Sequence, residues 1–368
     1  MSPELYIGMM SGTSADGVDA SLVKFEHSRA FTVIDNHFEA FPRALRIAVN
    51  NIGRCADLTD DVELKNLDEA LCEIYVKTVH ALLDHTDITI ADVTAIANHG
   101  QTVRHEPNAN PPRSIQLGAP QRLAQQLERP VISHFRQGDL EVGGQGAPLM
   151  PAFHAHCLDN AEPSAIINIG GIANVTLLNV GPQPIGFDTG PGNTLMDQWI
   201  EQHEQQAYDK EGAWARSGTV NKPLLAQLLE DPYFAKAYPK STGPDFFNLA
   251  WLEQIAGDQI KKLTAKDVQA TLTELTAISI ARSLELPEDT SAFLCGGGAH
   301  NRYLIERLEH HCPTLNVATT ADRGLPPDWV ESVGFAWLGY CHRHGIKSNL
   351  PSVTGAQKAV VLGELYLP

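Results

Sequence analysis

Three clusters of small and polar residues have the composition of phosphate-binding turns. The first is Ser11–Asp19, which combines glycine, serine, threonine and aspartate between two apolar runs. Small residues let backbone N–H groups approach a phosphate closely, and hydroxyl groups donate further hydrogen bonds to it. The alternative for this cluster taken alone is a polar hairpin turn without a ligand, because glycine and aspartate are common turn residues.

Two later clusters change this balance. Asn168–Asn174 stands between two apolar runs, so it repeats the design of strand, small-residue turn and strand. Gly296–Gly298 follows an apolar run and precedes a helical pattern, which places it between a strand and a helix. The repetition predicts two copies of one phosphate-binding design. Together with the third glycine cluster, it favours a ligand-binding role for the first cluster over a plain turn.

Asp188 is the candidate general base. It directly follows a strand-like apolar approach ending at Phe187 and precedes a turn, where an acid can project into a cleft instead of solvent. The alternative is an Asx-turn residue that holds the loop Thr189–Asn193, because aspartate stabilises turns in this way. The spacing alone does not decide between these two roles.

Other nucleotide and metal motifs are absent from the sequence. It contains no G-x-x-x-x-G-K-[ST] and no Gly-Lys dipeptide, which excludes a P-loop, and no G-x-G-x-x-G follows a strand. H-E-x-x-H is also absent, and three pairs of histidines lack acidic or thiolate partners at metal spacing, so we interpret them as surface or packing residues: His154 and His156, His310 and His311, His342 and His344. Without a P-loop lysine, a phosphate site has to rely on backbone amides and a divalent metal, with Asp16, Asp19 or Asp188 holding Mg²⁺ directly or through water.

Strands and helices alternate around these residues. The runs Leu5–Met10 and Ala20–Phe25 predict a hairpin around the first cluster. Apolar spacing predicts helices at 61–84, 120–128, 266–284 and 301–308, and short apolar runs predict strands at 93–97, 130–133 and 292–295. Such alternation is typical of layered α/β folds, and we place a domain boundary near residue 130.

Composition and charge narrow the class of protein. The chain has 368 residues, 43% hydrophobic and 19% charged, with 29 glycines and 23 prolines, which excludes collagen-like, disordered and coiled-coil classes. At about 150 residues per domain, this length predicts two domains or one large one. The 27 Lys and Arg residues against 44 Asp and Glu give a net charge of −17, which repels nucleic acid and anionic membranes. We therefore expect neither as a partner.

The sequence indicates a cytoplasmic protein. Its six cysteines form no C-x-x-C pair, so reduced thiols are expected instead of a zinc site or a disulfide framework. Met1–Glu4 has no basic region followed by an apolar stretch, so no secretory signal is visible. The longest uncharged run, Pro163–Phe187, contains Gly170–Gly171 and several Asn and Pro residues, which would make a poor membrane helix.

The order of the motifs resembles that of a known family. The opening hairpin, the mid-chain hairpin with an acidic loop and the late strand–glycine–helix resemble the superfamily of sugar kinases, heat-shock protein 70 and actin. More closely, most of the chain resembles the anhydro-N-acetylmuramic acid kinase family. The motifs that carry this resemblance are Gly8–Asp19, His99–His105, Gly143–Leu149, Asn168–Asn174, Asp188–Asn193, Ser241–Asp245, Cys295–Gly298 and Asn349–Gly355. So many matches in one order are highly specific.

The chain departs from the family pattern at few positions. His134 stands before Phe135 where the family more often has Asp, and Ser332 follows Glu331 where Ala is usual. A family role for an acid before Phe135 is therefore not carried over. Neither change touches the phosphate loops or Asp188.

The resemblance implies an α/β protein with the two-domain fold of the actin-like ATPases, which is ribonuclease H-like, around a central nucleotide cleft. We expect residues 1–130 to form the first domain with phosphate loop 1. Residues 131–345 are expected to form the second domain with phosphate loop 2, the catalytic aspartate and the adenosine loop, and segment 346–368 to return to the first. The family also suggests a homodimer.

The reaction that the resemblance implies is phosphorylation of 1,6-anhydro-N-acetylmuramic acid by ATP. The anhydro ring opens in the same reaction, and the product, N-acetylmuramic acid 6-phosphate, feeds peptidoglycan recycling. The O6 atom of this sugar is already bonded to C1 and carries no proton. A carboxylate base must therefore take a proton from water as that water attacks C1, while O6 leaves and receives the phosphoryl group.

The resemblance also implies a role for each candidate residue. Asp188 is expected to be the base, and Asp16 and Asp188 to hold Mg²⁺, through water or directly. The sugar is expected at Arg136 and Glu331, since a guanidinium suits the lactyl carboxylate. The ATP phosphates are expected at Gly12, Thr13, Ser14, Ala15, Asp16, Gly17, Val18, Asp19, Gly170, Gly171 and Asn174, and the adenosine at Gly296, Gly297 and Gly298.

Both sugar residues have structural alternatives. Arg136 is able to pair with Asp139 or Glu141, and Glu331 begins an apparent helix, where an acid meets the helix dipole favourably.

Three other functions share features with this sequence. A kinase for a conventional amino sugar or hexose shares every phosphate feature and is the main alternative. An ATP-driven binding scaffold is more distant, because no substrate-binding domain follows residue 345 or so. A sugar-sensing repressor would need a DNA-binding module before the first strand at Leu5.

Overall fold

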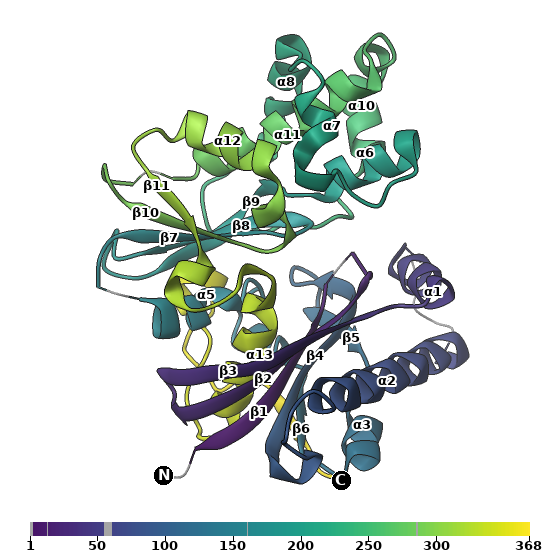
Figure 1. Cartoon of the computed structure of the whole chain (residues 1–368), viewed down its shortest axis with the longest axis vertical. Coiled ribbons are helices and arrows are strands. Elements are labelled where there is room, and N and C mark those ends of the chain that lie inside the picture. Colours follow the sequence, from purple (N-terminus) through teal and green to yellow (C-terminus); the bar gives the residue numbers. More distant parts are fainter. Residues whose placement is uncertain (1–2, 13, 55–60, 160, 285) are drawn as a thin grey trace. The chain divides into compact units, whose positions relative to one another are not determined.

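The computed structural model describes residues 3–12, 14–54, 61–159, 161–284 and 286–368. The chain forms two compact units (Figure 1). The first unit comprises Met1–Asp159 and Trp329–Pro368, and the second comprises Asn160–Asp328. Within the described ranges, no helix is both long and apolar enough to cross a membrane.

The first unit is built on one mixed sheet. Its strands are β1 (Glu4–Ser11), β2 (Gly17–His27), β3 (Ala30–Ala40), β4 (Val93–Glu106), β5 (Arg113–Leu117), β6 (Val131–Ser133) and β12 (Glu364–Tyr366). Its helices are α1 (Arg43–Arg54), α2 (Asp61–Leu83), α3 (Pro120–Leu127), α4 (Gln137–Glu141), α5 (Met150–Phe153), α13 (Val330–Arg343) and α14 (Pro351–Thr354). The strand order is β12-β6-β4-β1-β2-β3, and β5 pairs with β4.

The alternation of side chains along β1 explains how helices cover both faces of this sheet. Ile7 belongs to a core shared with Leu71 and Tyr75 of α2, whereas its neighbour Tyr6 points to the opposite face. There the Tyr6 ring lies 5.7 Å from the ring of Tyr340 on α13. Gly8 permits close approach of that helix, because a Cβ at this position would lie 2.0 Å from the carbonyl oxygen of Ser332.

The second unit repeats the mixed design. Its strands are β7 (Ser164–Ile169), β8 (Ile172–Leu178), β9 (Ile185–Pro191), β10 (Ser291–Cys295) and β11 (Asn316–Thr319). Its helices are α6 (Thr194–Glu204), α7 (Ala213–Arg216), α8 (Lys222–Leu229), α9 (Pro232–Ala235), α10 (Leu249–Ile260), α11 (Ala265–Ala281) and α12 (Arg302–His311). The strand order is β11-β10-β7-β8-β9.

Both sheets share one topology, which confirms the predicted fold class. In each sheet the first three strands of the unit form an antiparallel meander. One later strand pairs in parallel with the first strand, and a second later strand pairs in parallel with that one. The order β3-β2-β1-β4-β6 in the first unit thus corresponds to β9-β8-β7-β10-β11 in the second. This is the ribonuclease H-like arrangement, and its occurrence in both units of one chain is the α/β, actin-like architecture expected from the motifs.

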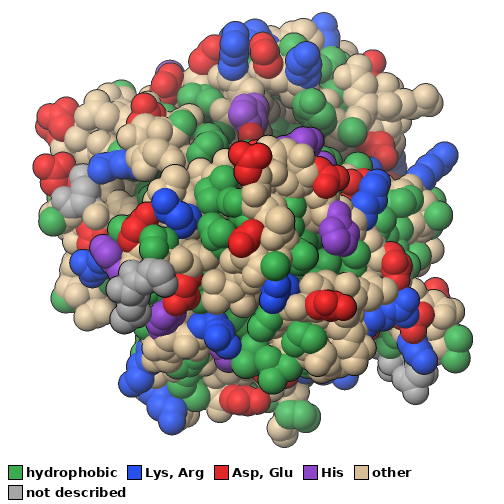
Figure 2. All heavy atoms as spheres, turned by 60° about the horizontal axis from the view of Figure 1, so that its bottom comes forward, with side chains coloured by type: hydrophobic (Ala, Val, Ile, Leu, Met, Phe, Trp, Pro, Cys, Tyr) green, Lys and Arg blue, Asp and Glu red, His purple; other side chains and the backbone are tan. Residues whose placement is uncertain are grey.

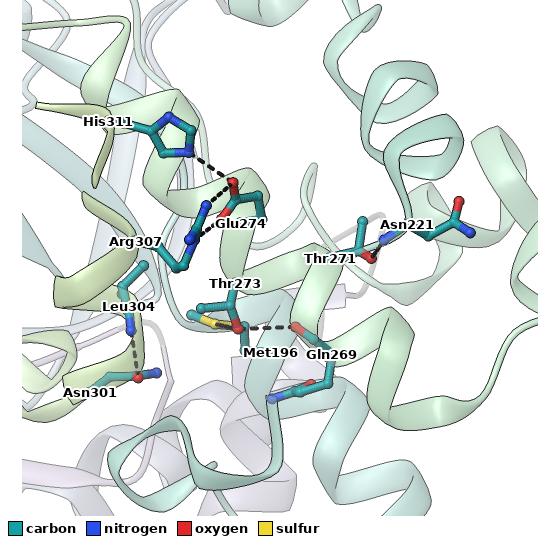
Figure 3. A network of polar contacts seen from close by, with 10 residues as sticks. All are labelled: Met196, Asn221, Gln269, Thr271, Thr273, Glu274, Asn301, Leu304, Arg307 and His311. Carbon is teal, nitrogen blue, oxygen red and sulfur yellow. Dashed lines mark hydrogen bonds and ion pairs between the residues drawn. The ribbon is translucent and has the colours of Figure 1, made fainter. Parts of the chain in front are cut away.

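Helix α11 carries polar side chains that fix its neighbours in the second unit (Figure 3). Glu274 accepts hydrogen bonds from the guanidinium of Arg307 at 2.6 and 2.9 Å and lies 2.8 Å from Nε2 of His311, both on α12. The hydroxyl of Thr271 accepts a hydrogen bond from the backbone N–H of Asn221, the residue that caps α8. These polar groups are tolerated next to the core because each has a hydrogen-bond partner.

The predicted elements are present with small differences at their ends. The opening and mid-chain hairpins are confirmed, as are the helices now seen as α2, α3, α11 and α12. The predicted strand at 93–97 extends to Glu106 because its outer half pairs with β5. The five described cysteines, all except Cys55, are free, and Cys55 lies outside the described residues.

The division into units does not coincide with the boundaries expected at residues 130 and 345. Strand β6 pairs with β4, so residues 131–133 complete the first sheet. Helix α13 packs on β1 and β4 of that sheet, so most of 329–345 also belongs to the first unit. The expected return of segment 346–368 to the first unit agrees with the pairing of β12 with β6.

Charged side chains are mixed on the face drawn in Figure 2. There Lys and Arg alternate with Asp, Glu and apolar groups, although the chain carries a net charge of −17. This face therefore presents no single large field of one sign.

Candidate active site

Phosphate loop 1 forms the turn between β1 and β2. The backbone N–H of Ala15 donates to the carbonyl oxygen of Gly12 at 3.1 Å, and Ala15 adopts a positive φ of 51°. The hydroxyl of Ser14 donates to Asp16 Oδ1 at 2.8 Å, and both side chains are exposed. Three of the predicted residues, Gly17, Val18 and Asp19, lie in β2 beyond the turn, and Thr13 lies outside the described residues.

The glycines of this loop are of two kinds. A Cβ on Gly17 would lie 2.5 Å from the carbonyl oxygen of Glu39, so packing against β3 requires glycine there. Among the described residues other than its chain neighbours, a Cβ on Gly12 would meet only the Ser14 hydroxyl, at 3.6 Å. Neighbouring atoms of the protein therefore do not require glycine at position 12, whereas open space beside its backbone suits a bound phosphate.

The predicted phosphate loop 2, Asn168–Asn174, contains the turn between β7 and β8, and this turn is hydrogen-bonded to the loop after β9. The backbone N–H groups of Asn193 and Gly192 donate to the carbonyl oxygens of Gly170 and Gly171 at 2.8 and 2.9 Å, respectively. A Cβ on Gly192 would lie 2.3 Å from the Gly170 oxygen, which explains a glycine in this motif. A Cβ on Gly170 itself would meet only one carbonyl oxygen, at 3.6 Å. The third predicted residue of this loop, Asn174, pairs with Asp188 in the sheet.

The predicted adenosine loop, Gly296–Gly298, lies against the predicted phosphate loop 2. A Cβ on Gly296 would lie 2.4 Å from Asn168 Oδ1, and one on Gly298 would lie 2.3 Å from the Ile169 side chain. By contrast, a Cβ on Gly297 would meet only the Asn193 side chain, at 3.9 Å. The structure thus brings these two predicted loops together within the second unit, with Gly170 and Gly297 beside open space.

Asp188 lies within β9, not after it. The sequence predicts a turn from Thr189 onward, whereas β9 continues to Pro191 because these residues pair with β8. The Asp188 side chain is 9% exposed, and its Oδ2 accepts a hydrogen bond from the backbone N–H of Thr242 at 2.9 Å. Its carbonyl oxygen accepts a hydrogen bond from the hydroxyl of Tyr233 at 2.8 Å. These contacts fix both the backbone and the carboxylate of the candidate base.

Lys240 is a neighbour of Asp188 that the sequence interpretation missed. Its carbonyl oxygen accepts the backbone N–H of Asp188 at 3.1 Å, and its ammonium group lies 4.8 Å from the centre of the Tyr233 ring. Burial lowers the pKa of Lys240, and the nearby charge of Asp188 opposes this effect. The signal was available, because Lys240 directly precedes the motif Ser241–Asp245.

The two predicted sugar residues lie in the first unit and interact electrostatically. Arg136 precedes α4, and Glu331 lies in the first turn of α13. Burial raises the pKa of Glu331, and the charge of Arg136 opposes this effect.

Arg136 is held by contacts other than the acidic partners considered from the sequence. Its Nη1 donates to the carbonyl oxygen of Gly146 at 2.8 Å. Its Nε and Nη2 lie 3.2 and 3.0 Å from Nε2 of the buried His99. Burial and the charge of Arg136 hold the pKa of His99 well below its usual value, so the imidazole is neutral and Nε2 accepts.

The two candidate magnesium ligands lie in different units, Asp16 in the first and Asp188 in the second. Carboxylate oxygens are suitable donors for Mg²⁺, which usually takes one or two of them together with waters and phosphate oxygens. Within the part of the chain that the structure describes, no group of three or more His, Cys, Asp or Glu side chains is placed to hold a metal. The donors present therefore suit an ion that arrives with a nucleotide better than a site made of protein ligands alone.

Comparison with known proteins identifies the family. The family model of anhydro-N-acetylmuramic acid kinase matches residues 4–368. The chain belongs to this family. Curated members include the enzymes of Shewanella pealeana, 45% identical over 370 residues, and Shewanella amazonensis, 46% identical over 373; each alignment covers 100% of this chain and 99% of the relative.

Solved structures of other proteins are more distant from this member of the kinase family. The activator of 2-hydroxyisocaproyl-CoA dehydratase from Clostridium difficile is 11% identical, with a TM-score of 0.45 and coverage of 90% of this chain and 93% of that one. A ROK family glucokinase from Streptomyces griseus is 12% identical, with a TM-score of 0.39 and coverage of 90% and 98%.

Proposed function

We propose that this protein phosphorylates 1,6-anhydro-N-acetylmuramic acid at O6 with ATP and opens the anhydro ring in the same reaction. The products are N-acetylmuramic acid 6-phosphate and ADP, and the reaction serves peptidoglycan recycling. The observation that carries the proposal is the family match, which extends over residues 4–368. The named relatives do not favour a conventional sugar kinase or a binding scaffold.

Asp188 is the base in this proposal. The anhydro sugar has no proton on O6, so the carboxylate takes a proton from the water that attacks C1. The C1–O6 bond breaks as the O6–P bond forms, and the bond from the γ-phosphorus to ADP breaks. Support comes from the position of Asp188, which is nearly buried and oriented by the N–H of Thr242.

The ATP phosphates are assigned to Gly12–Asp19 and to Gly170, Gly171 and Asn174. The open space beside Gly12 and Gly170 supports this assignment, because a phosphate can approach their backbone. Adenosine is assigned to Gly296–Gly298, which lie against phosphate loop 2. The central nucleotide cleft stays a prediction.

Magnesium is assigned to the oxygen donors Asp16 and Asp188, through water or directly. When bound with ATP, the ion would neutralise charge on the phosphates during transfer. Asp16 and Asp188 would each contribute one carboxylate.

Arg136 and Glu331 are assigned to the sugar. A guanidinium pairs well with a carboxylate, so Arg136 is assigned to the lactyl group. Its contacts with Gly146 and His99 support this role, because they fix the orientation of the guanidinium. The homodimer and the cytoplasmic location also remain proposals. The supply of ATP in the cytoplasm supports the proposed location.

The test compares sugars in an ATP-consumption assay. Purified protein is given ATP and Mg²⁺ with 1,6-anhydro-N-acetylmuramic acid, N-acetylmuramic acid, N-acetylglucosamine or glucose. We expect rapid ADP release only with the anhydro sugar, and N-acetylmuramic acid 6-phosphate as its product. Equal or faster turnover of a free sugar would contradict the proposal and favour the conventional kinase.

A further inference from the structure

Asp139 is a fully buried carboxylate that accepts hydrogen bonds from three neutral groups. It lies on α4, and its side chain is 0% exposed. Its Oδ2 accepts the backbone N–H of Gly146 at 2.8 Å. Its Oδ1 accepts the side-chain N–H of Asn349 and the hydroxyl of Thr354, each at 2.7 Å. A buried carboxylate with both oxygens used is costly to place, so its position calls for a reason beyond packing.

The three donors come from two segments that the sequence separates widely. Gly146 closes the glycine-rich loop Gly143–Gly146, whereas Asn349 and Thr354 belong to the segment that leads into and through α14. A Cβ on Gly144 would lie 2.1 Å from Asp139 Oδ2, so glycine is needed at that position for the loop to wrap around the carboxylate. Asp139 therefore fixes this loop to the C-terminal segment.

The loop in turn holds Arg136. The carbonyl oxygen of Gly146 accepts Nη1 of Arg136 at 2.8 Å, while the N–H of the same residue is bound to Asp139. The opposite edge of the guanidinium contacts Nε2 of His99 at 3.0 and 3.2 Å. One residue thus links the buried carboxylate to the guanidinium.

We propose that Asp139 is a positioning residue for the sugar, which acts through Gly146 to fix the guanidinium of Arg136. The inference rests on the proposed role of Arg136 in binding the lactyl carboxylate. Asp139 fixes the N–H of Gly146, and the carbonyl oxygen of the same residue fixes Nη1 of Arg136.

A neutral amide cannot replace this carboxylate. In Asp139→Asn, the new NH2 group would face either the N–H of Gly146 or the NH2 of Asn349. The amide of Asn349 cannot turn away without loss, since its oxygen accepts the N–H of Val360 at 2.6 Å. In either orientation the new NH2 group faces another donor, so one hydrogen bond of the buried network is lost.

The first experiment compares Asp139→Asn with Asp209→Asn in the full chain. Asp209 is a matched control in the second unit: it is 7% exposed, and its oxygens accept the backbone N–H groups of Trp214 and Ala215, each at 2.9 Å. Both variants lose a buried charge bound by neutral donors. We expect a lower melting temperature in both, but a rise of about tenfold in the KM for the anhydro sugar only in Asp139→Asn. The KM for ATP should stay unchanged in each.

A milder pair keeps the test valid if Asp139→Asn does not fold. Thr354→Ser retains the hydroxyl that donates to Asp139, and Thr354→Val loses it while keeping nearly the same volume. We expect Thr354→Ser to have the wild-type KM for the sugar and Thr354→Val to have a KM raised several-fold. Equal sugar KM values in the two variants would overturn the inference.

A double-mutant comparison decides whether Asp139 acts through Arg136. If it does, the sugar KM of Asp139→Asn combined with Arg136→Lys should be close to that of Arg136→Lys alone. Multiplied effects on the sugar KM would show that Asp139 acts independently of Arg136, and would contradict the inference. Failure of the proposed function looks different, because wild-type protein would then not consume ATP with the anhydro sugar at all.

Discussion

The backbone N–H of Thr242 donates to Asp188 Oδ2 at 2.9 Å, across 54 positions of the chain. The hydrogen bond is charge-assisted, and such bonds are stronger and more directional than neutral ones. It links the motif at Ser241–Asp245 to the motif at Asp188–Asn193. These two motifs are therefore parts of one structural feature, a carboxylate whose orientation is set by a distant loop.

Asp188→Asn should reduce turnover while leaving ATP binding intact. The amide has the shape of the carboxylate but cannot accept the proton from water, so kcat should fall by about 10²- to 10⁴-fold. Steady-state kinetics with the anhydro sugar gives kcat, and calorimetry gives the dissociation constant of ATP. Asp209→Asn is the control and should retain kcat. Turnover near the wild-type value in Asp188→Asn would eliminate Asp188 as the base.

Gly12 and Gly8 should respond to substitution in opposite ways. Gly12→Val puts a side chain into the space assigned to phosphate, where the protein itself offers only the Ser14 hydroxyl at 3.6 Å. ATP affinity should therefore fall by about tenfold or more, with little change in melting temperature. Gly8→Ala should instead lower the melting temperature, because its Cβ would clash with the carbonyl oxygen of Ser332. Unchanged ATP affinity in a normally melting Gly12→Val would remove this loop from the nucleotide site.

Glu274 should make the second unit less stable in acid. Burial raises the pKa of this carboxyl, but hydrogen bonds from Arg307 and His311 outweigh burial and hold it below 4.5. Because the pKa of Glu274 is lowered, its ionised carboxylate stabilises the folded state at pH values above 4.5. This stabilisation is lost as the pH falls through the pKa of Glu274 in the folded state. Glu274→Gln should thus cost about 1–3 kcal/mol at pH 7 and flatten the loss of stability as the pH falls below 4.5.

Glu306 provides the control for this pH experiment. It pairs with Arg216 at 2.6 Å, but both side chains are about half exposed, at 52% and 47%. Exposed ion pairs are screened by water, so Glu306→Gln should leave the thermal unfolding curves unchanged both at pH 7 and in acid. An identical acid response of wild type and Glu274→Gln would show that the Glu274 pair does not control stability in this range.

The sequence is informative about features that neighbouring residues determine. The hairpin around Gly12 and the hairpin around Gly170 follow from apolar runs and a small-residue turn, and α2 and α11 follow from helical periodicity. The residues that determine each of these features lie close to one another along the chain. Local patterns therefore suffice to predict the two hairpin turns, whereas phosphate binding by them stays a proposal.

Contacts between distant segments could not be read from local patterns. Strand β6 pairs with β4, and β12 pairs with β6, so the first unit extends beyond the boundary expected at residue 130. Asp188 was expected to end a strand, but β8 pairs with residues up to Pro191. The Asp139 network joins α4 to Asn349 and Thr354, and the sequence offered Asp139 only as a partner of Arg136.

The bond that breaks in the sugar gives the most direct test of coupled hydrolysis and phosphorylation. If water attacks C1 while O6 receives the phosphoryl group, a reaction in oxygen-18 water should place the label at C1 and none in the bridging oxygen of the phosphate ester. Attack opposite O6 also inverts the configuration at C1, so the first-formed anomer must be examined by NMR before ring opening scrambles it. Separate hydrolysis would release free N-acetylmuramic acid when ATP is withheld. Rapid release of that sugar, or efficient phosphorylation of it when supplied directly, would overturn the coupled mechanism.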